Sequence, residues 1–234
     1  MTTVQVARPS QLGDVYDTIL VRSFQADELV DKAAFMHHST WGEVLLTEDA
    51  EGVITGAAVA DHHADTRLSV LEYLAVSPDH RGAGSGSALL TAAVERWAEL
   101  VSPGALLAEI ERPDAHPATA QFGDPVRRLA FYQRHGFKAL AVPYYQPALS
   151  ETQQPVPDLI LGVLVLDPAW ASQDGTRFLE GRRLEEVLTH RIPAPEEGDP
   201  SAYEALLSAT RDPAGVELVE LSDYARIPRS GPLG

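Results

Sequence analysis

The chain has 234 residues, of which 44% are hydrophobic and 22% charged, a composition typical of compact globular proteins rather than of disordered or fibrous ones. Its formal net charge of −16 argues against nucleic acids and anionic membranes as partners, because both require a basic surface, and it favours a cationic partner or substrate. The absence of cysteine excludes disulfides, thiolate nucleophiles and cysteine-ligated zinc.

The first residues indicate a cytoplasmic protein. The stretch MTTVQVARPSQLGDVYD places polar and acidic side chains where a secretory signal needs a basic segment and then an apolar core. The longest apolar run, LILGVLVL at 159–166, is far shorter than the roughly 20 residues of a membrane-spanning helix. We therefore expect no membrane segment.

The first half of the chain predicts one strand, two helices and then three strands. One helix is expected to begin near Gln11, with Ser10 as its cap, and the other to cover about 26–37. Extended runs bounded by turn residues predict strands at 3–7, 43–47, 53–60 and 68–76. Three strands in succession favour an α/β pattern other than a doubly wound repeat.

The middle of the chain alternates helices and strands. Apolar residues four apart predict an amphipathic helix over about 85–100. A second helix over about 125–135 is expected to stop at Gly136, since glycine readily takes the left-handed conformation beyond a helix end. Strands are predicted at 105–111, 137–144 and 159–166.

The character of the sequence changes after Asp167. Residues 174–190 and 200–211 have helical patterns, and a segment rich in proline and glycine separates them. We predict a domain over residues 1–167, followed by a mainly helical extension, 168–234, that packs on the domain or on a partner subunit.

The stretch LAVSPDHRGAGSG, residues 74–86, places three glycines between a predicted strand and a predicted helix. Such a turn binds anions, because free N–H groups meet at the positive end of the helix dipole and glycine lets a phosphate approach. A nucleoside-triphosphate loop would need a lysine after Gly86, and a dinucleotide loop would need glycine in place of Ser87. The remaining candidate is the pyrophosphate loop of an acyl-CoA enzyme.

This stretch resembles the acyl-CoA-binding signature of the GNAT superfamily of N-acetyltransferases, R/Q-x-x-G-x-G/A, through Arg81, Gly84 and Gly86. A second stretch, FYQRHGF at 131–137, resembles the later GNAT motif in which a helix carrying a tyrosine ends in glycine. The resemblance covers about residues 3–167. It implies the GNAT fold, a mixed central β-sheet flanked by helices, here with a C-terminal helical extension.

The resemblance also implies an acetyl-CoA site without a metal. The end of the strand would pair its backbone with the pantetheine arm, and the glycine turn would hold the pyrophosphate. The implied binding residues are Leu74, Ala75, Val76, Arg81, Gly82, Ala83, Gly84, Ser85, Gly86 and Ser87. Tyr132 stands where the family has its general acid, whereas the asparagine often found seven residues earlier is replaced by Pro125.

Transfer to an amine also needs a base, since an alkylamine of pKa ~10.4 is only about 0.04% neutral at pH 7. Glu72 and Glu109, on neighbouring predicted strands, are the candidates, with Glu111 a third choice. In a regular strand Glu72 would point to the same side as Leu74. Several GNAT enzymes that modify protein N-termini carry their catalytic glutamate where Glu109 stands.

The predicted function is an N-acyltransferase that moves an acetyl group from acetyl-CoA to a primary amine by direct attack, with a carboxylate base and a tyrosine acid. The acceptor would be a small cationic amine or an amine of a peptide or lysine. The alternative is a GNAT module that binds acyl-CoA as a sensor or scaffold without turnover. The extension would also allow a homodimer.

Overall fold

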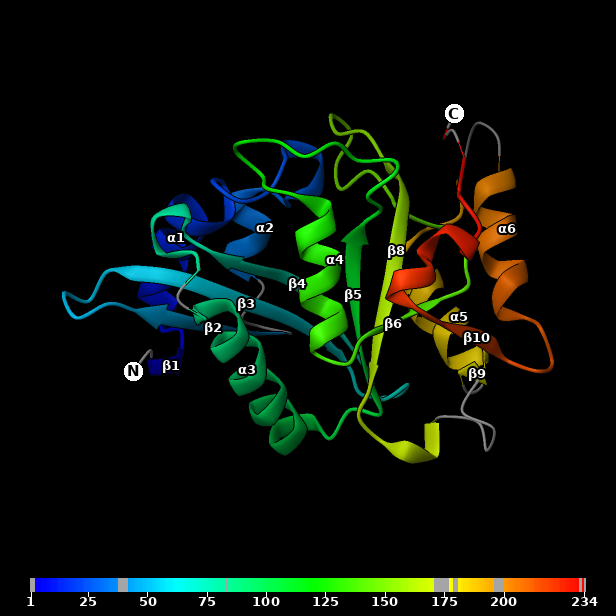
Figure 1. Ribbon diagram of the computed structural model, residues 1–234, viewed down its shortest axis with the longest axis horizontal. Coiled ribbons are helices and arrows are strands. Elements are labelled where there is room, and N and C mark those ends of the chain that lie inside the picture. Colours follow the sequence, from blue (N-terminus) through cyan, green and yellow to red (C-terminus); the bar gives the residue numbers. More distant parts are fainter. Residues whose placement is uncertain are drawn as a thin grey trace.

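The computed structural model describes residues 3–37, 42–82, 84–170, 177–178, 181–195, 200–231 and 233. Within these ranges the chain forms a mixed sheet of ten strands with helices on both faces (Figure 1). The strands are β1 (Thr3–Val6), β2 (Gly42–Glu48), β3 (Ile54–His63), β4 (Leu68–Val76), β5 (Ala105–Glu111), β6 (Lys138–Leu140), β7 (Tyr144–Gln146), β8 (Val156–Val165), β9 (Arg177–Phe178) and β10 (Val216–Glu220). The helices are α1 (Leu12–Asp14), continued by a π-helix over Val15–Leu20, then α2 (Lys32–His37), α3 (Ser85–Val101), α4 (Pro125–Arg134), α5 (Gly181–Arg191) and α6 (Ser201–Thr210).

Two neighbouring strands near the middle of the sheet, β4 and β5, separate part-way along their length. The order is β1-β2-β3-β4-β5-β8-β6-β10-β9, with β7 beside β8. Among the strands so described, β4 and β5 are the one parallel pair, and their pairing runs only from Leu68 with Ala105 to Leu71 with Ala108. Beyond that point β4 and β5 no longer pair with each other, so the space between their second halves leaves room for a ligand.

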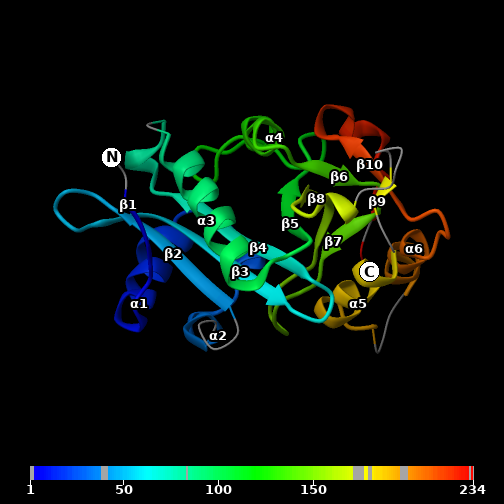
Figure 2. The same cartoon turned by 90° about the horizontal axis from the view of Figure 1, so that it is seen from below.

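The helices cover the two faces of the sheet in different groups. Figure 2 shows α3 and α4 on one side of the sheet and α1, α2, α5 and α6 on the other. The core under α3 and α4 includes Leu89, Trp97 and Leu129, whereas α5 contributes Leu184 and Val187 to the core of the opposite face. The predicted α/β fold with a mixed sheet between helices is confirmed.

The first region of the chain departs from the prediction of one helix over 26–37. A 3₁₀ turn covers Ala26–Glu28, the chain then becomes extended at Leu29, and α2 begins only at Lys32. Leu29 is buried, and the backbone N–H of Val30 donates to the hydroxyl of Tyr73 over 3.1 Å. These tertiary contacts outweigh the local helical pattern.

The C-terminal extension contributes two strands to the sheet, β9 and β10, as well as the helices α5 and α6. The two expected helices correspond to α5 and α6, although the expected start near 174 lies outside the described residues. The strand β10, which the sequence did not predict, pairs antiparallel with β6. Among the helices that are described, none is long and apolar enough to cross a membrane.

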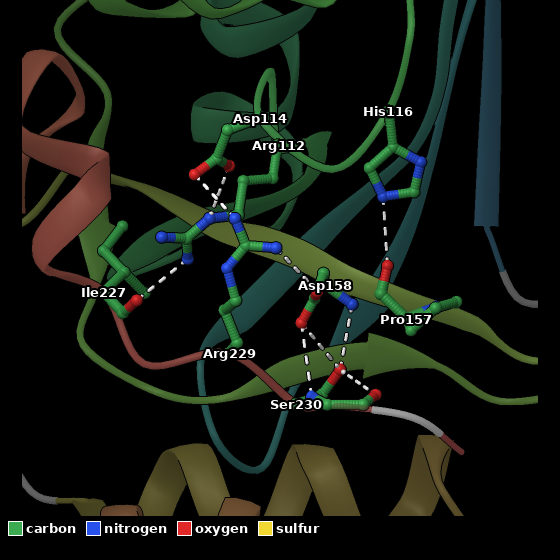
Figure 3. Close-up of polar contacts among 9 residues, drawn as sticks. Arg112, Asp114, His116, Pro157, Asp158, Ile227, Arg229 and Ser230 are labelled. Atoms are coloured by element: carbon green, nitrogen blue, oxygen red, sulfur yellow. Dashed lines mark hydrogen bonds and ion pairs between the residues drawn. The ribbon is translucent and has the colours of Figure 1, made fainter. Parts of the chain in front are cut away.

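A network of arginines and carboxylates holds the C-terminal tail against the loop that follows β5 (Figure 3). Arg112, which is buried, donates to Asp114 over 2.8 Å and to the carbonyl of Ile227 over 2.8 Å. Arg229 bridges Asp114, at 2.7 Å, and Asp158, at 3.1 Å. The loop over 112–124 is therefore tied to the last part of the chain.

Candidate active site

A cleft of about 610 Å³ lies where β4 and β5 separate. Its walls come from the ends of both strands, the glycine turn, the loop over 118–124 and one side of α4. Residues far apart in the sequence contribute, since Glu28 and Gln146 line the cleft together with α4. The space is large enough for an extended substrate and a second reactant.

The glycine turn forms one end of this cleft. Gly82 and Gly84 have φ values of +91° and +81°, in the left-handed region that glycine tolerates best, and Gly84 caps the start of α3. A Cβ atom at either position would meet no heavy atom within 4 Å, so the turn faces open space. Free N–H groups of the first turn of α3 therefore face a region with room for an anion. Ala83, also predicted to bind the cofactor, lies outside the described residues.

Arginines line the same end of the cleft. Arg81, Arg127 and Arg134 all reach it, and the Arg127 side chain is 90% exposed. Arg128, the next residue after Arg127, instead donates hydrogen bonds to the carboxylate of Glu111 and to the carbonyl of Phe122. The glycine end of the cleft thus carries positive charge that a phosphorylated ligand could meet.

The end of β4 presents a free backbone edge to the cleft. Leu74, Ala75 and Val76 pair with β3 on one side, and on the side of β5 no strand of the described ranges pairs with them. One carbonyl on this stretch is occupied, since Nε of Arg81 donates to Val76 over 3.1 Å. The remaining edge can accept another extended chain, as any unpaired strand edge does.

A β-bulge in β4 overturns the predicted direction of Glu72. Val59 pairs with Tyr73, but the next residue of β3, Ala60, pairs with Leu71, so Glu72 is the extra residue. Leu74 packs in the core under α3 and α4, whereas Glu72 is bonded to α5 on the opposite face. The bulge therefore places Glu72 on the same face as Glu109 rather than on that of Leu74.

The two candidate bases share one arginine. Both N–H₂ groups of Arg191, the last residue of α5, donate to the two carboxylate oxygens of Glu72, and the Nη2–Oε2 distance is 3.1 Å. Nη2 also lies 3.1 Å from Oε1 of Glu109, and the hydroxyl of Tyr144 donates to the same oxygen over 2.7 Å. Within the described part of the chain, Oε2 of Glu109 accepts no hydrogen bond.

Burial governs the electrostatics of Glu109. Burial raises the pKa of this carboxyl group, the charge of Arg191 opposes that rise, and the charge of Glu72 adds to it. The pKa of Arg191 is raised well above its ordinary value, because the attraction of Glu72 and Glu109 outweighs the effect of burial. Arg191 is therefore charged, and the three groups together carry one net negative charge when both glutamates are ionised.

Tyr132 lies on α4 and lines the cleft from the other face of the sheet. Its ring packs edge-on against Phe131 and Phe137, and only 6% of the residue is exposed. Burial raises the pKa of its hydroxyl to about 12. Among the described residues this hydroxyl has no hydrogen-bond partner, so it can donate to a group in the cleft.

The remaining predicted features have structural partners. Glu111, the third choice as base, is buried and ion-paired with Arg128. Pro125 occupies the first turn of α4, where a missing N–H costs nothing, and Asp124 caps the helix by accepting from the N–H of Val126 over 2.9 Å. Sequence reasoning missed Arg191 and Tyr144, which come from elements outside the two motifs.

Comparison with known families places this site in its context. Residues 40–139 match the family described as Acetyltransferase (GNAT) domain. Residues 40–139 form a GNAT acetyltransferase domain. The matched residues of this GNAT domain include the glycine turn, both glutamates and Tyr132, and the match confirms the family and the enzyme class predicted from the sequence.

Solved structures agree with the GNAT fold. A GNAT-family protein from Bacteroides thetaiotaomicron aligns with a TM-score of 0.54 at 22% identity, over 80% of this chain and 96% of its own. The ribosomal-protein-S18-alanine N-acetyltransferase from Escherichia coli gives 0.53 at 18%, over 71% and 95%. A phosphinothricin acetyltransferase from Sinorhizobium meliloti, in complex with acetyl-CoA, gives 0.51 at 20%, over 71% and 89%. A comparison with curated protein sequences gave no match.

Proposed function

We propose that this chain transfers an acetyl group from acetyl-CoA to a primary amine that is a cation at neutral pH. The observation that supports this most directly is the cleft between β4 and β5. One space is lined by a glycine turn, a strand edge, a half-buried glutamate and a tyrosine. Among the described residues, one oxygen of that glutamate and the hydroxyl of that tyrosine have no hydrogen-bond partner. These are the groups that a direct transfer requires, and they come from four separate elements.

In this proposal the donor occupies the glycine end of the cleft. The pyrophosphate of acetyl-CoA lies against Gly82 and residues 84–87, with Arg81 beside it. The pantetheine arm runs along the free edge at Leu74–Val76. The open space at the Cβ positions of Gly82 and Gly84 supports this placement, because a side chain at either position would enter the volume that the phosphates need. The thioester then lies where the two strands separate.

Glu109 acts as the base in this arrangement. Both oxygens of Glu72 are engaged by Arg191, whereas Oε2 of Glu109 is unbonded among the described residues and can take a proton from the ammonium group, directly or through a water. The raised pKa of Glu109 makes it a stronger base than an exposed glutamate. Since only the ionised carboxylate can act, we expect kcat/KM to fall as the pH drops through that raised pKa.

The transfer then conserves atoms and charge. The neutral amine attacks the thioester carbonyl, the C–N bond forms, and the C–S bond breaks with its electron pair leaving on sulfur. Tyr132 donates a proton to that sulfur, and its pKa of about 12 keeps the hydroxyl protonated at neutral pH. Glu109 passes the first proton to solvent and then accepts, directly or through the same water, the second proton that the nitrogen loses as the amide forms. Tyr132 is reprotonated from solvent, and the net products are the acetylated amine, CoA and one released proton.

The charge around the acceptor end favours a cationic amine. Glu72 and Glu109 outnumber Arg191 there, and Glu28 also lines the cleft. Burial raises the pKa of the Glu28 carboxyl group. The enzymes from Escherichia coli and Sinorhizobium meliloti are named for an alanine of ribosomal protein S18 and for phosphinothricin. A small cationic amine or a peptide amine fits the same requirement here.

The test is release of CoA thiol from acetyl-CoA with a panel of diamines, polyamines, lysine peptides and peptides with a free N-terminus. We expect an acetylated product, identified by mass spectrometry, with at least one member of the panel. Glu109→Gln should lower kcat by roughly 10²-fold or more and remove the acidic limb of the pH profile, whereas Glu72→Gln should retain that limb. Acetyl-CoA binding measured by calorimetry, with no product from any amine, would support the sensor or scaffold instead.

A further inference from the structure

The guanidinium between the two glutamates comes from outside the GNAT match. Arg191 ends α5, in the extension, whereas Glu72 and Glu109 lie within residues 40–139. The three side chains are similarly shielded, with 19%, 17% and 18% of their surfaces exposed for Arg191, Glu72 and Glu109. A helix outside the matched residues thus contacts two glutamates that line the cleft.

The position of Arg191 is fixed by packing on both sides of it in sequence. Leu184, Val187 and Leu188 of α5 are buried against the sheet, and Ile192, which directly follows the arginine, is 1% exposed. Near the other end of the helix, a Cβ atom on Gly181 would lie 1.6 Å from the carbonyl oxygen of Thr210, so α5 and α6 are in close backbone contact. The guanidinium is therefore held by a core and not by a surface loop.

We propose that Arg191 is a positioning residue that the C-terminal extension supplies to the transfer site. It neutralises Glu72 and fixes Glu109 through one oxygen, which leaves the other oxygen for the amine. This inference rests on the function proposed above, because it concerns the same glutamate. The extension would thus supply a cation to the site, and the GNAT-matched residues that face Glu109 contain no such cation among the described groups.

Arg191 is needed because the two shielded carboxylates of Glu72 and Glu109 repel each other. Without a cation between them, Glu72 and Glu109 would favour a state in which one of them holds a proton, and the base would be lost at neutral pH. The other titratable groups that face Glu109 are Tyr144 and Tyr73, which are neutral because burial raises the pKa of each hydroxyl. Arg191 is thus the one cation among the described groups that act on Glu109.

Around Arg191 itself, one further charge matters. Asp61 on β3 interacts with it electrostatically, and burial of Asp61 is outweighed by His63, 3.1 Å away, and by Arg191, so that its pKa is lowered. Asp61 stays ionised in the pH range of interest. Removing Arg191 therefore leaves an excess of negative charge, which acts in the same direction on Glu109.

The experiment measures the pKa of Glu109 directly, by NMR titration of the full chain labelled with ¹³C at the glutamate carboxyl. The Glu109 signal is identified by its loss in Glu109→Gln. In Arg191→Met the midpoint should rise by about 1–3 pH units, the effect of one nearby opposite charge, and the acidic limb of kcat/KM should move with it. Arg182→Gln is the matched control, since this arginine of the same helix pairs with Glu186 and is 84% exposed, and it should shift neither.

A second variant separates positioning from simple support of the fold. In Glu72→Gln combined with Arg191→Met, the repelling charge is removed together with the cation, so the Glu109 midpoint should return towards that of the unaltered chain. If Arg191→Met does not fold, the double variant is compared with Arg191→Lys, which keeps the charge. In both, the Glu109 midpoint should stay within about 1 pH unit of that of the unaltered chain. Glu72→Gln alone should lower the Glu109 midpoint.

A Glu109 midpoint that is unchanged in folded Arg191→Met, or that shifts equally in Arg182→Gln, would overturn the inference. A double variant that shifts as far as Arg191→Met would overturn it too. Failure of the proposed function has a different signature, because the unaltered chain would then give no product with any amine while the titration still showed the shift.

Discussion

Replacing Tyr132 with phenylalanine should lower activity without lowering stability. The substitution removes one hydroxyl and keeps the ring that packs against Phe131 and Phe137. Only 6% of the residue is exposed, and its hydroxyl has no partner among the described residues. No internal hydrogen bond is therefore broken, and the only group lost is the proposed proton donor.

The expected magnitudes follow from that environment. An unpaired buried hydroxyl costs about 1–3 kcal/mol, and water in the cleft offsets part of this, so the free energy of unfolding should be unchanged or rise by up to about 1 kcal/mol. Because general acid catalysis contributes roughly 10²–10⁴-fold, kcat should fall by at least about 10²-fold. The Kd for acetyl-CoA should stay the same, since the ring remains in the cleft wall.

The measurements are urea unfolding, calorimetric binding of acetyl-CoA and thiol release, with Tyr144→Phe as the control. Tyr144 is also almost fully buried, but its hydroxyl donates to Glu109 over 2.7 Å, so its loss should cost about 1.5–3 kcal/mol. Equal destabilisation by the two substitutions would refute the reading of the Tyr132 hydroxyl as unpaired. An unchanged kcat in Tyr132→Phe would refute its role as the acid.

Three further predictions concern the turn, the tail and the extension. Gly84→Ala and Gly52→Ala both place alanine at φ +81° and should each cost about 1–2 kcal/mol of stability, but only Gly84→Ala should weaken acetyl-CoA binding, by about tenfold in calorimetry. Partial burial of Asp114 is outweighed by hydrogen bonds and charges from Arg112 and Arg229, so the pKa of its carboxyl group is lowered. The stability that this carboxylate contributes is present above its ordinary pKa of 3.8 and is lost as the pH falls through the lowered pKa. Asp114→Asn should therefore flatten this part of the acid unfolding curve. Gly181→Ala should cost about 1–3 kcal/mol in urea unfolding and lower kcat, whereas an unaltered kcat would mean that α5 can shift without consequence for the cleft.

The parts of the site that lie in short continuous stretches could be predicted from the sequence. The glycine turn and the tyrosine before Gly136 are such stretches, and the structure places both on the cleft. Arg191 could not be predicted in the same way, because its contact with Glu72 joins residues 119 positions apart and depends on how α5 packs. No local pattern distinguishes this arginine from the others on the same helix.

Irregular strands account for the other differences. LSVLEYLAV has the composition of an uninterrupted strand, and only its pairing with β3 shows that Glu72 is an extra residue. The strand β10 has five residues, VELVE, and lies between β6 and the two-residue edge strand β9, so its place in the sheet depends on pairing with both. Both features depend on a neighbouring strand, which a pattern along one segment does not contain.

The topology of the extension explains how a segment outside the matched residues reaches Glu72 and Glu109. The strands β9 and β10 pair with each other beyond β6, so the chain between them leaves that edge of the sheet and returns to it. The helices α5 and α6 lie in that excursion, on the face opposite α3 and α4 (Figure 2). There α5 buries Leu184 and Val187 against the sheet, next to the strands that separate to form the cleft. An arginine at the end of α5 is then directed to the two glutamates by the same packing that stabilises the extension, so loss of that packing and loss of the charge balance at Glu109 should occur together.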